Sequence, residues 1–78
     1  MNQLHIHFDQ SQGALPRVVV LVERRGFVID EMKMEPAQEG HNLTLMVTPR
    51  DSSRCVFHLG RQIERLHGIR QVVVPSAA

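Results

Sequence analysis

The 78-residue sequence contains no tryptophan or tyrosine and only one cysteine, Cys55. A lone cysteine excludes a disulfide within the chain and leaves no cysteine pair to hold zinc. No stretch approaches the roughly 18 apolar residues that span a bilayer, and the amino-terminal residues lack the basic cluster and apolar run of a secretory signal. We therefore expect a cytoplasmic protein that does not enter a membrane.

The sequence also has little net charge and few aromatic residues. Nine Lys or Arg against eight Asp or Glu leave a formal charge of +1, which argues against a general phosphate-binding surface. The three aromatics are Phe8 and Phe27, expected inward or at a turn, and Phe57, expected on a helix. They form no platform on which bases stack, so we expect no nucleic-acid partner. Domains this small are often stabilised by disulfides, metals or oligomerisation, and the composition favours the last.

The first half of the chain predicts a strand, a helix and a second strand. Residues 4–8 alternate apolar and polar side chains, and residues 9–13 read as a loop. Apolar residues at helical spacing then follow, with Pro16 suited to a first turn and Gly26 placed for a left-handed cap. Residues 27–35 alternate again, but the phase slips between Ile29 and Met32, which predicts a bulge.

The second half repeats the order of the first. Pro36 is expected to end the second strand, and a turn at residues 37–40 leads to a third strand at 42–47. A second helix is expected to begin at caps offered by Asp51, Ser52 and Ser53 and to close at Gly68. Its buried stripe comprises Cys55, Val56, Leu59, Ile63 and Leu66. Residues 69–74 form the last strand, and 75–78 a frayed tail.

The resulting order, βαββαβ, predicts an α+β ferredoxin-like sandwich: a four-stranded antiparallel sheet with two helices on one face. We expect one domain over residues 1–78, with a core at about 3–74. The other sheet face stays open. It should display His5, His7, Glu31, Lys33, Asn42, Thr44 and Met46.

Other residues admit both a chemical and a plain structural interpretation. His5, His7 and His41 would be needed for a three-histidine metal site, but solvated surface histidines explain them, so no metal site is expected. Ser52 or Ser53 with His58 would make a nucleophile and base, but caps and a solvent-facing histidine suffice, so no catalytic residue is expected. Val20, Phe57 and Arg61 point away from the apolar stripes. They are either single exposed residues or a contact for a partner protein.

The segment from Gly13 to Met34, GALPRVVVLVERRGFVIDEMKM, resembles the first half of ACT domains: a loop ending in Gly, an apolar helix, an Arg-Gly-aromatic turn and a strand. The segments NLTLMV (42–47) and QIERLHGIRQVVV (62–74) are similar to the second half of the small regulatory subunit of acetolactate synthase. With one such unit and a short tail, the chain looks most like the short form of that subunit, as in isozyme II.

That resemblance implies a non-catalytic chain that activates a catalytic subunit in branched-chain amino-acid (valine, leucine and isoleucine) synthesis. The cofactors, thiamine diphosphate with Mg²⁺ and FAD, would be held by that other chain. The family implies a homodimer in which two sheets join edge to edge and the first helices touch, with amino-acid sites at the interface. A free-standing ACT sensor serving another enzyme is the alternative.

The implied effector site involves Gln10, Gly13, Ala14, Leu15, Val28 and Ile29. Gly13 lets backbone amides approach a carboxylate, although it is equally explained by the turn into the helix. Valine-sensing relatives carry Asn in the loop and after the Gly-aromatic pair, where this chain has Gln10 and Val28. We therefore expect weak or absent valine feedback.

Overall fold

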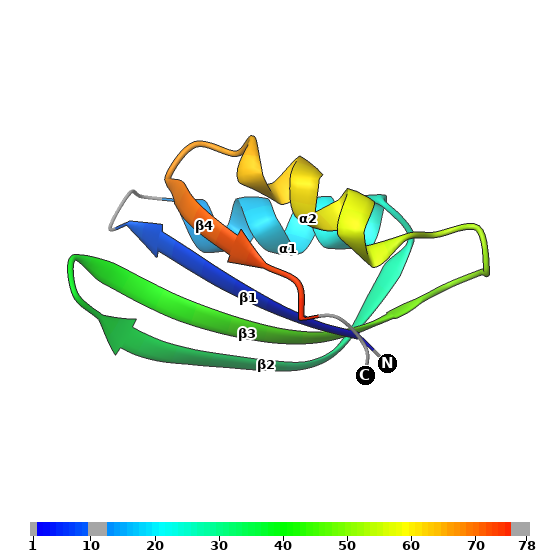
Figure 1. Cartoon of the computed structure of the whole chain (residues 1–78), viewed down its shortest axis with the longest axis horizontal. Helices are drawn as coiled ribbons and strands as arrows, with labels where there is room; N and C mark the ends of the chain where they lie inside the picture. Colours follow the sequence, from blue (N-terminus) through cyan, green and yellow to red (C-terminus); the bar gives the residue numbers. More distant parts are fainter. Residues whose placement is uncertain (1, 10–12, 76–78) are drawn as a thin grey trace.

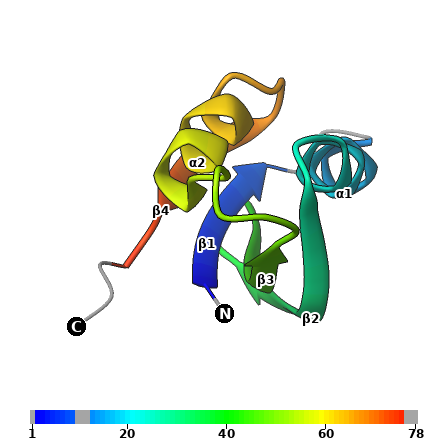
Figure 2. The ribbon, with the colours of Figure 1, turned by 90° about the vertical axis from the view of Figure 1, so that its right-hand side faces the viewer.

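The computed structural model describes residues 2–9 and 13–75 as six elements in the predicted order. The strands are β1 (Asn2–Asp9), β2 (Phe27–Ala37), β3 (Gly40–Pro49) and β4 (Ile69–Val73), and the helices are α1 (Ala14–Arg24) and α2 (Val56–Glu64). The strands pair antiparallel in the order β2-β3-β1-β4, and both helices cover the same face of the sheet (Figures 1 and 2). The predicted ferredoxin-like fold is confirmed.

The core lies between the two central strands and the helices. On β1 and β3 the inward residues stand opposite one another, with Leu4 paired to Leu45 and Ile6 to Leu43. All of them are at most 1% exposed, as are the helix residues that cover them, Val18, Val22, Leu59 and Ile63. The inward residues of the strands, which alternate with outward ones, therefore pack with the apolar stripes of the helices in one cluster.

Helix α1 lies between the two glycines that the sequence predicts as its boundaries. Gly13 precedes it with a φ of 83°, and Gly26 follows it with a φ of 86°. Both values lie in the left-handed region, which glycine enters without steric cost. The Arg25 amide donates to the Leu21 carbonyl and so closes the last turn. In the part of the chain that the structure describes, neither helix is long and apolar enough to cross a membrane.

Strand β2 is an edge strand, and this explains where it departs from prediction. The expected bulge is confirmed by a register shift between Ile29 and Glu31. Pro36 does not end the strand, which continues to Ala37 with Pro36 opposite His41. An edge strand bonds on one side only, so a missing amide donor is tolerated. Met32 and Met34 lie on the helix-covered side of the sheet but remain 48% and 46% exposed.

Helix α2 starts later than predicted. Residues 51–53 form a turn, and Cys55, with φ −115° and ψ 123°, is the residue before the first helical turn. No side chain caps the helix, so the expected caps at Asp51, Ser52 and Ser53 were wrong. Cys55 itself is exposed rather than buried, because its extended backbone places it outside the stripe. The helix also ends at Glu64, before Gly68, whose φ of 91° instead turns the chain into β4.

We predict that Gly40→Ala lowers the stability of the domain. Gly40 stands opposite Asp9 in the central strand pair, and a Cβ there would overlap the carbonyl oxygen of Phe8 and lie 3.0 Å from the Asp9 Cα. Both neighbours are backbone atoms, so the cost should be about 1–3 kcal/mol. Thermal and urea unfolding measure it. Gln38→Ala, an exposed change in the same turn, is the control and should stay within about 0.5 kcal/mol of the parent; equal stability of all three proteins would contradict the prediction.

Candidate functional site

A pocket of about 350 Å³ opens at the amino-terminal end of α1. It is formed where the end of β1, the start of α1 and the helix-covered side of the β2-β3 hairpin meet. Its lining residues are Phe8, Asp9, Gly13, Ala14, Leu15, Pro16, Met34 and His41.

This pocket combines apolar walls with a polar end. The first amides of a helix have no carbonyl partner within the helix, and the helix dipole favours negative charge there. Gly13 itself carries no side chain, and among residues 2–9 and 13–75 no side chain caps α1. Phe8, Leu15 and Met34 supply apolar surface a short way off. The arrangement suits a small molecule with a carboxylate and an apolar portion.

The structure divides the predicted effector residues between two places. Gly13, Ala14 and Leu15 lie together in the pocket. Val28 and Ile29 do not line it: they sit at the opposite end of β2, across from Thr48 and Val47. Val28 is 42% exposed there. Gln10 lies outside the described residues.

Sequence reasoning missed the other five residues of the pocket, Phe8, Asp9, Pro16, Met34 and His41. His41 stacks on Phe8, with ring centroids 5.6 Å apart and planes inclined by 26°. Counting the β1-β3 register would have found this, because Phe8 stands directly opposite His41. His41 therefore points to the helix-covered side of the sheet.

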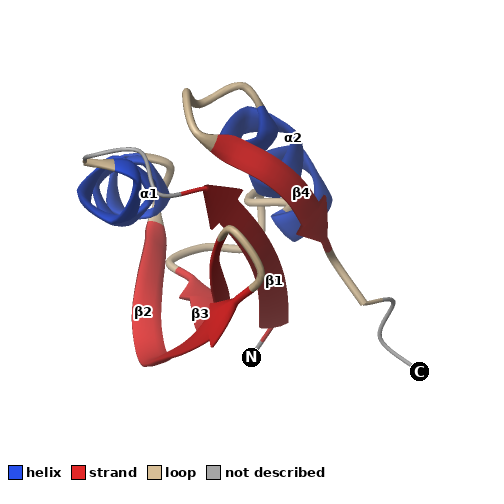
Figure 3. Ribbon diagram, turned by 90° about the vertical axis from the view of Figure 1, so that its left-hand side faces the viewer, coloured by secondary structure: helices blue, strands red, loops and turns tan. Residues whose placement is uncertain are grey.

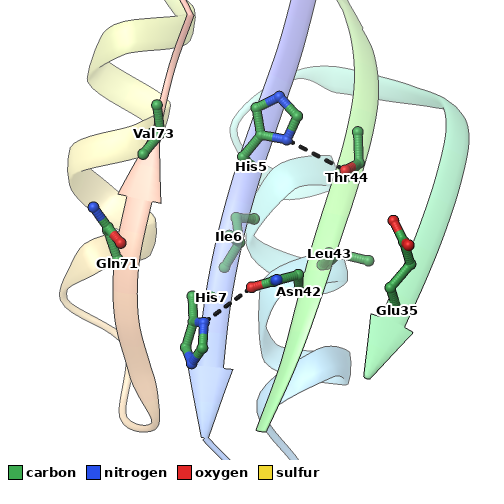
Figure 4. A pocket seen from close by; sticks show the side chains of 9 residues that line it. All are labelled: His5, Ile6, His7, Glu35, Asn42, Leu43, Thr44, Gln71 and Val73. Carbon is green, nitrogen blue, oxygen red and sulfur yellow. Dashed lines mark hydrogen bonds between the residues drawn. The ribbon is translucent and has the colours of Figure 1, made fainter. Parts of the chain in front are cut away.

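The open face of the sheet holds a second and larger hollow, about 510 Å³ in volume (Figure 4). Two cross-strand hydrogen bonds orient its histidines: His5 Nδ1 lies 3.3 Å from Thr44 Oγ1, and His7 Nδ1 lies 2.9 Å from Asn42 Oδ1. An amide oxygen only accepts, so His7 Nδ1 is the donor in that pair. The predicted display of His5, His7, Asn42 and Thr44 on this face is confirmed.

The three-histidine metal site is not assembled. His41 lies on the other side of the sheet from His5 and His7. The second nitrogens of His5 and His7 point toward opposite ends of their strand, so they do not converge on one cation (Figure 4). Within residues 2–9 and 13–75, no three His, Cys, Asp or Glu side chains are grouped to bind a metal.

The turn before α2 does not form a nucleophile and base. The Ser53 hydroxyl and amide both donate to Asp51 Oδ1 rather than to His58. These two bonds, aided by Arg54 3.5 Å away, hold the pKa of Asp51 below its ordinary value. Ser53 thus fixes the turn before α2 instead of capping the helix.

The residues predicted to touch a partner lie on two separate surfaces. Phe57, 53% exposed, and Arg61 line one hollow of about 420 Å³ between α2 and β4. Val20, 52% exposed, lies on α1 in a different hollow. All three are exposed as predicted, but no single contact patch contains them.

Comparison with known proteins assigns the family. Residues 10–72 match the model of the ACT domain. The fold resembles a crystal structure of the ACT domain from GTP pyrophosphokinase of Chlorobium tepidum, with a TM-score of 0.77, 11% identity and 95% of each chain covered. It also resembles the solution structure of that domain, with a TM-score of 0.74, 12% identity, and 99% of this chain and 86% of the other covered.

No curated protein matches the sequence. ACT domains are regulatory, non-catalytic modules that commonly dimerise and bind amino-acid effectors. Because the matched model spans most of the chain, this protein belongs to the ACT domain family.

Proposed function

We propose that residues 1–78 form one ACT domain that acts in the cytoplasm as the small regulatory subunit of an acetolactate synthase. In this role the chain binds and activates a catalytic subunit that carries thiamine diphosphate, Mg²⁺ and FAD. The resemblance of residues 13–34, 42–47 and 62–74 to such subunits supports the choice of enzyme. The observation that carries the regulatory role is the unpaired edge of β2 beside the pocket at the start of α1.

A homodimer through β2 explains why the effector residues are split. The strand is 11 residues long, against five for the other edge strand, β4, so it offers the longer row of backbone groups. A two-fold axis pairs the strand with its copy antiparallel, so the start of one strand meets the end of the other. The partner's Val28 and Ile29 are thereby brought toward Met34 and the pocket.

Charges along β2 favour one register of this pairing. With Met32 on the two-fold axis, Glu31 stands opposite the partner's Lys33, and the same pair forms a second time by symmetry. Opposite charges directly across strands contribute about 0.2–1 kcal/mol for each pair. The two exposed methionines, Met32 and Met34, become covered in the same assembly.

We predict that charge exchange on β2 controls dimerisation. Lys33→Glu and Glu31→Lys, tested singly, each place like charges across the axis and should weaken the dimer about 2- to 30-fold. The double variant, Glu31→Lys with Lys33→Glu, restores opposite charges and should restore the dimer. Sedimentation equilibrium measures all four proteins. A monomeric parent at high concentration would reject the dimer, and failure of the double variant to recover would reject the register.

We predict that adding the chain to a purified acetolactate synthase catalytic subunit raises acetolactate formation and tightens thiamine diphosphate binding. The expected cause is that a regulatory subunit binds the active conformation of the catalytic chain preferentially. Steady-state rates and cofactor titration provide the measurement, with the Gly40→Ala protein heated beyond unfolding as the control. An unchanged rate together with unchanged cofactor affinity would reject this assignment.

We predict weak or absent binding of valine, and a gain in affinity on Val28→Asn. Val28 offers no polar atom to the ligand, and one hydrogen bond to a buried ligand group is worth enough to change affinity about tenfold. Isothermal titration calorimetry compares the parent with Val28→Asn, and Val28→Leu serves as the apolar control. Tight valine binding by the parent, or an equal gain in both variants, would contradict the prediction.

A second candidate function is an ACT module that senses an amino acid for a different enzyme. The observation favouring it is that the similar solved structures are described as the ACT domain from GTP pyrophosphokinase. The assays described above distinguish the two candidate functions. Saturable heat from an amino acid, without any effect on acetolactate synthase, would favour this second function.

A further inference from the structure

A partly apolar surface lies between the two helices, on the flank of α1 that faces α2. Figures 2 and 3 look roughly along both helices and show them side by side above the sheet, separated from one another. Two side-chain hydrogen bonds join the α1 segment to the α2 segment: Arg17 donates to the His67 carbonyl at 3.5 Å, and Arg25 donates to Gln62 Oε1 at 3.2 Å. The flank of α1 that faces α2 is therefore fixed in place.

A shallow hollow of about 340 Å³ lies along this flank of α1. Its floor is apolar, formed by Pro16, Val20, Leu21 and Leu66. Arg17 and Arg24, one on each side of Val20 in sequence, stand at its rim. We call these six residues the valley site. Aliphatic surface beside arginine is the composition that protein interfaces favour.

The arginines at and beside the valley site have no carboxylate partner among the residues that the structure describes. In the described part of the chain, none of Arg17, Arg24 and Arg25 lies within ion-pair distance of a carboxylate. The ion pairs there join Arg54 to Asp51 and Arg70 to Glu39. The bridging contacts of Arg17 and Arg25 end on neutral oxygens, so they satisfy hydrogen bonds without balancing charge.

The acidic residues of the chain lie mostly elsewhere. Four of them, Asp30, Glu31, Glu35 and Glu39, are on β2 or in the turn that follows it. The two glutamates on helices, Glu23 and Glu64, do not line the valley site. A chain with a formal charge of only +1 therefore presents a locally basic surface here.

We propose that the valley site binds an acidic amphipathic helix of the enzyme that this domain regulates. The aliphatic floor would receive the apolar stripe of that helix, and the arginine rim would pair with its carboxylates. At 11 residues, α1 is about 16 Å long, which matches a partner helix of about three turns. The inference rests on the proposed role of the chain as a module serving a larger protein, but not on which enzyme that is.

Chemistry favours such a helix over a nucleic acid. The valley site has no aromatic ring on which a base could stack. A phosphate backbone would also offer no apolar surface to pack against its aliphatic floor. The site is also separate from the proposed dimer contact. The site occupies the flank of α1 that faces α2, whereas β2, which lies beneath α1, has its free edge on the side away from α2, so both can be occupied at once.

The test uses the whole chain, labelled with ¹⁵N, and a defined probe. The probe is a helical peptide about 14 residues long, with leucines on one face flanked by glutamates. A basic version replaces every glutamate by lysine. We expect saturable binding of the acidic peptide, weakened by salt, with shift changes confined to α1 and the residues around Leu66.

Charge reversal supplies the decisive comparison. The variant Arg17→Glu with Arg24→Glu should bind the acidic peptide about tenfold or more weakly and should gain affinity for the basic one. The control, Arg50→Glu with Arg61→Glu, changes charge equally at exposed positions outside the valley site and should bind as the parent does. The ¹⁵N spectrum of each variant verifies its fold.

Four results would overturn the proposal: no peptide binding by the parent; shifts centred on β2 or on Phe57; equal affinity for both peptides; or a short RNA binding the valley site more tightly than the acidic peptide. The proposed function fails separately. If the peptide binds as expected while acetolactate synthase is unaffected by the chain, the docking site stands and the enzyme assignment falls.

Discussion

The pairing of β1 with β3 is the interaction on which the rest of the structure depends. The inward apolar residues at the middle of these two strands are buried, and both helices gain their stability by covering them. Gly40 allows the two backbones to approach closely at one end of the pair. Two helices of 11 and nine residues are too few to cover all four strands equally. The exposed methionines of β2 follow directly from that shortage.

Element order, the sheet and most of the core could be predicted because the signals were local and agreed with one another. The phase slip near Ile29 predicted the bulge, and Gly26 predicted the end of α1. The errors came from tertiary context. Pro36 is tolerated because its strand is at an edge, and Cys55 is exposed because the Asp51–Ser53 turn postpones the helix. The spacing of apolar residues along the sequence predicts neither the edge position of β2 nor the turn before α2.

The candidate site was less predictable than the fold. Gly13 to Leu15 were found because a glycine before an apolar helix is a local signal. His41 and Met34 were not found, because they reach the pocket only through the register of three strands. Val28 and Ile29 lie at the other end of β2 from the pocket within one chain, and in the proposed dimer a second copy brings them toward it. When a site is shared between two copies of a chain, the spacing of residues along one sequence does not show which residues come together.

The uneven placement of charge has a further physical consequence. Acidic groups gather along β2 and basic groups along the helices, so a nearly neutral chain carries a substantial electric dipole. Such a molecule turns in the field of a charged neighbour before the two surfaces touch, which raises the fraction of productive collisions. Added salt shortens the range of that orientation to a few ångströms. The speed with which this domain assembles should therefore respond to ionic strength more than its folded stability does.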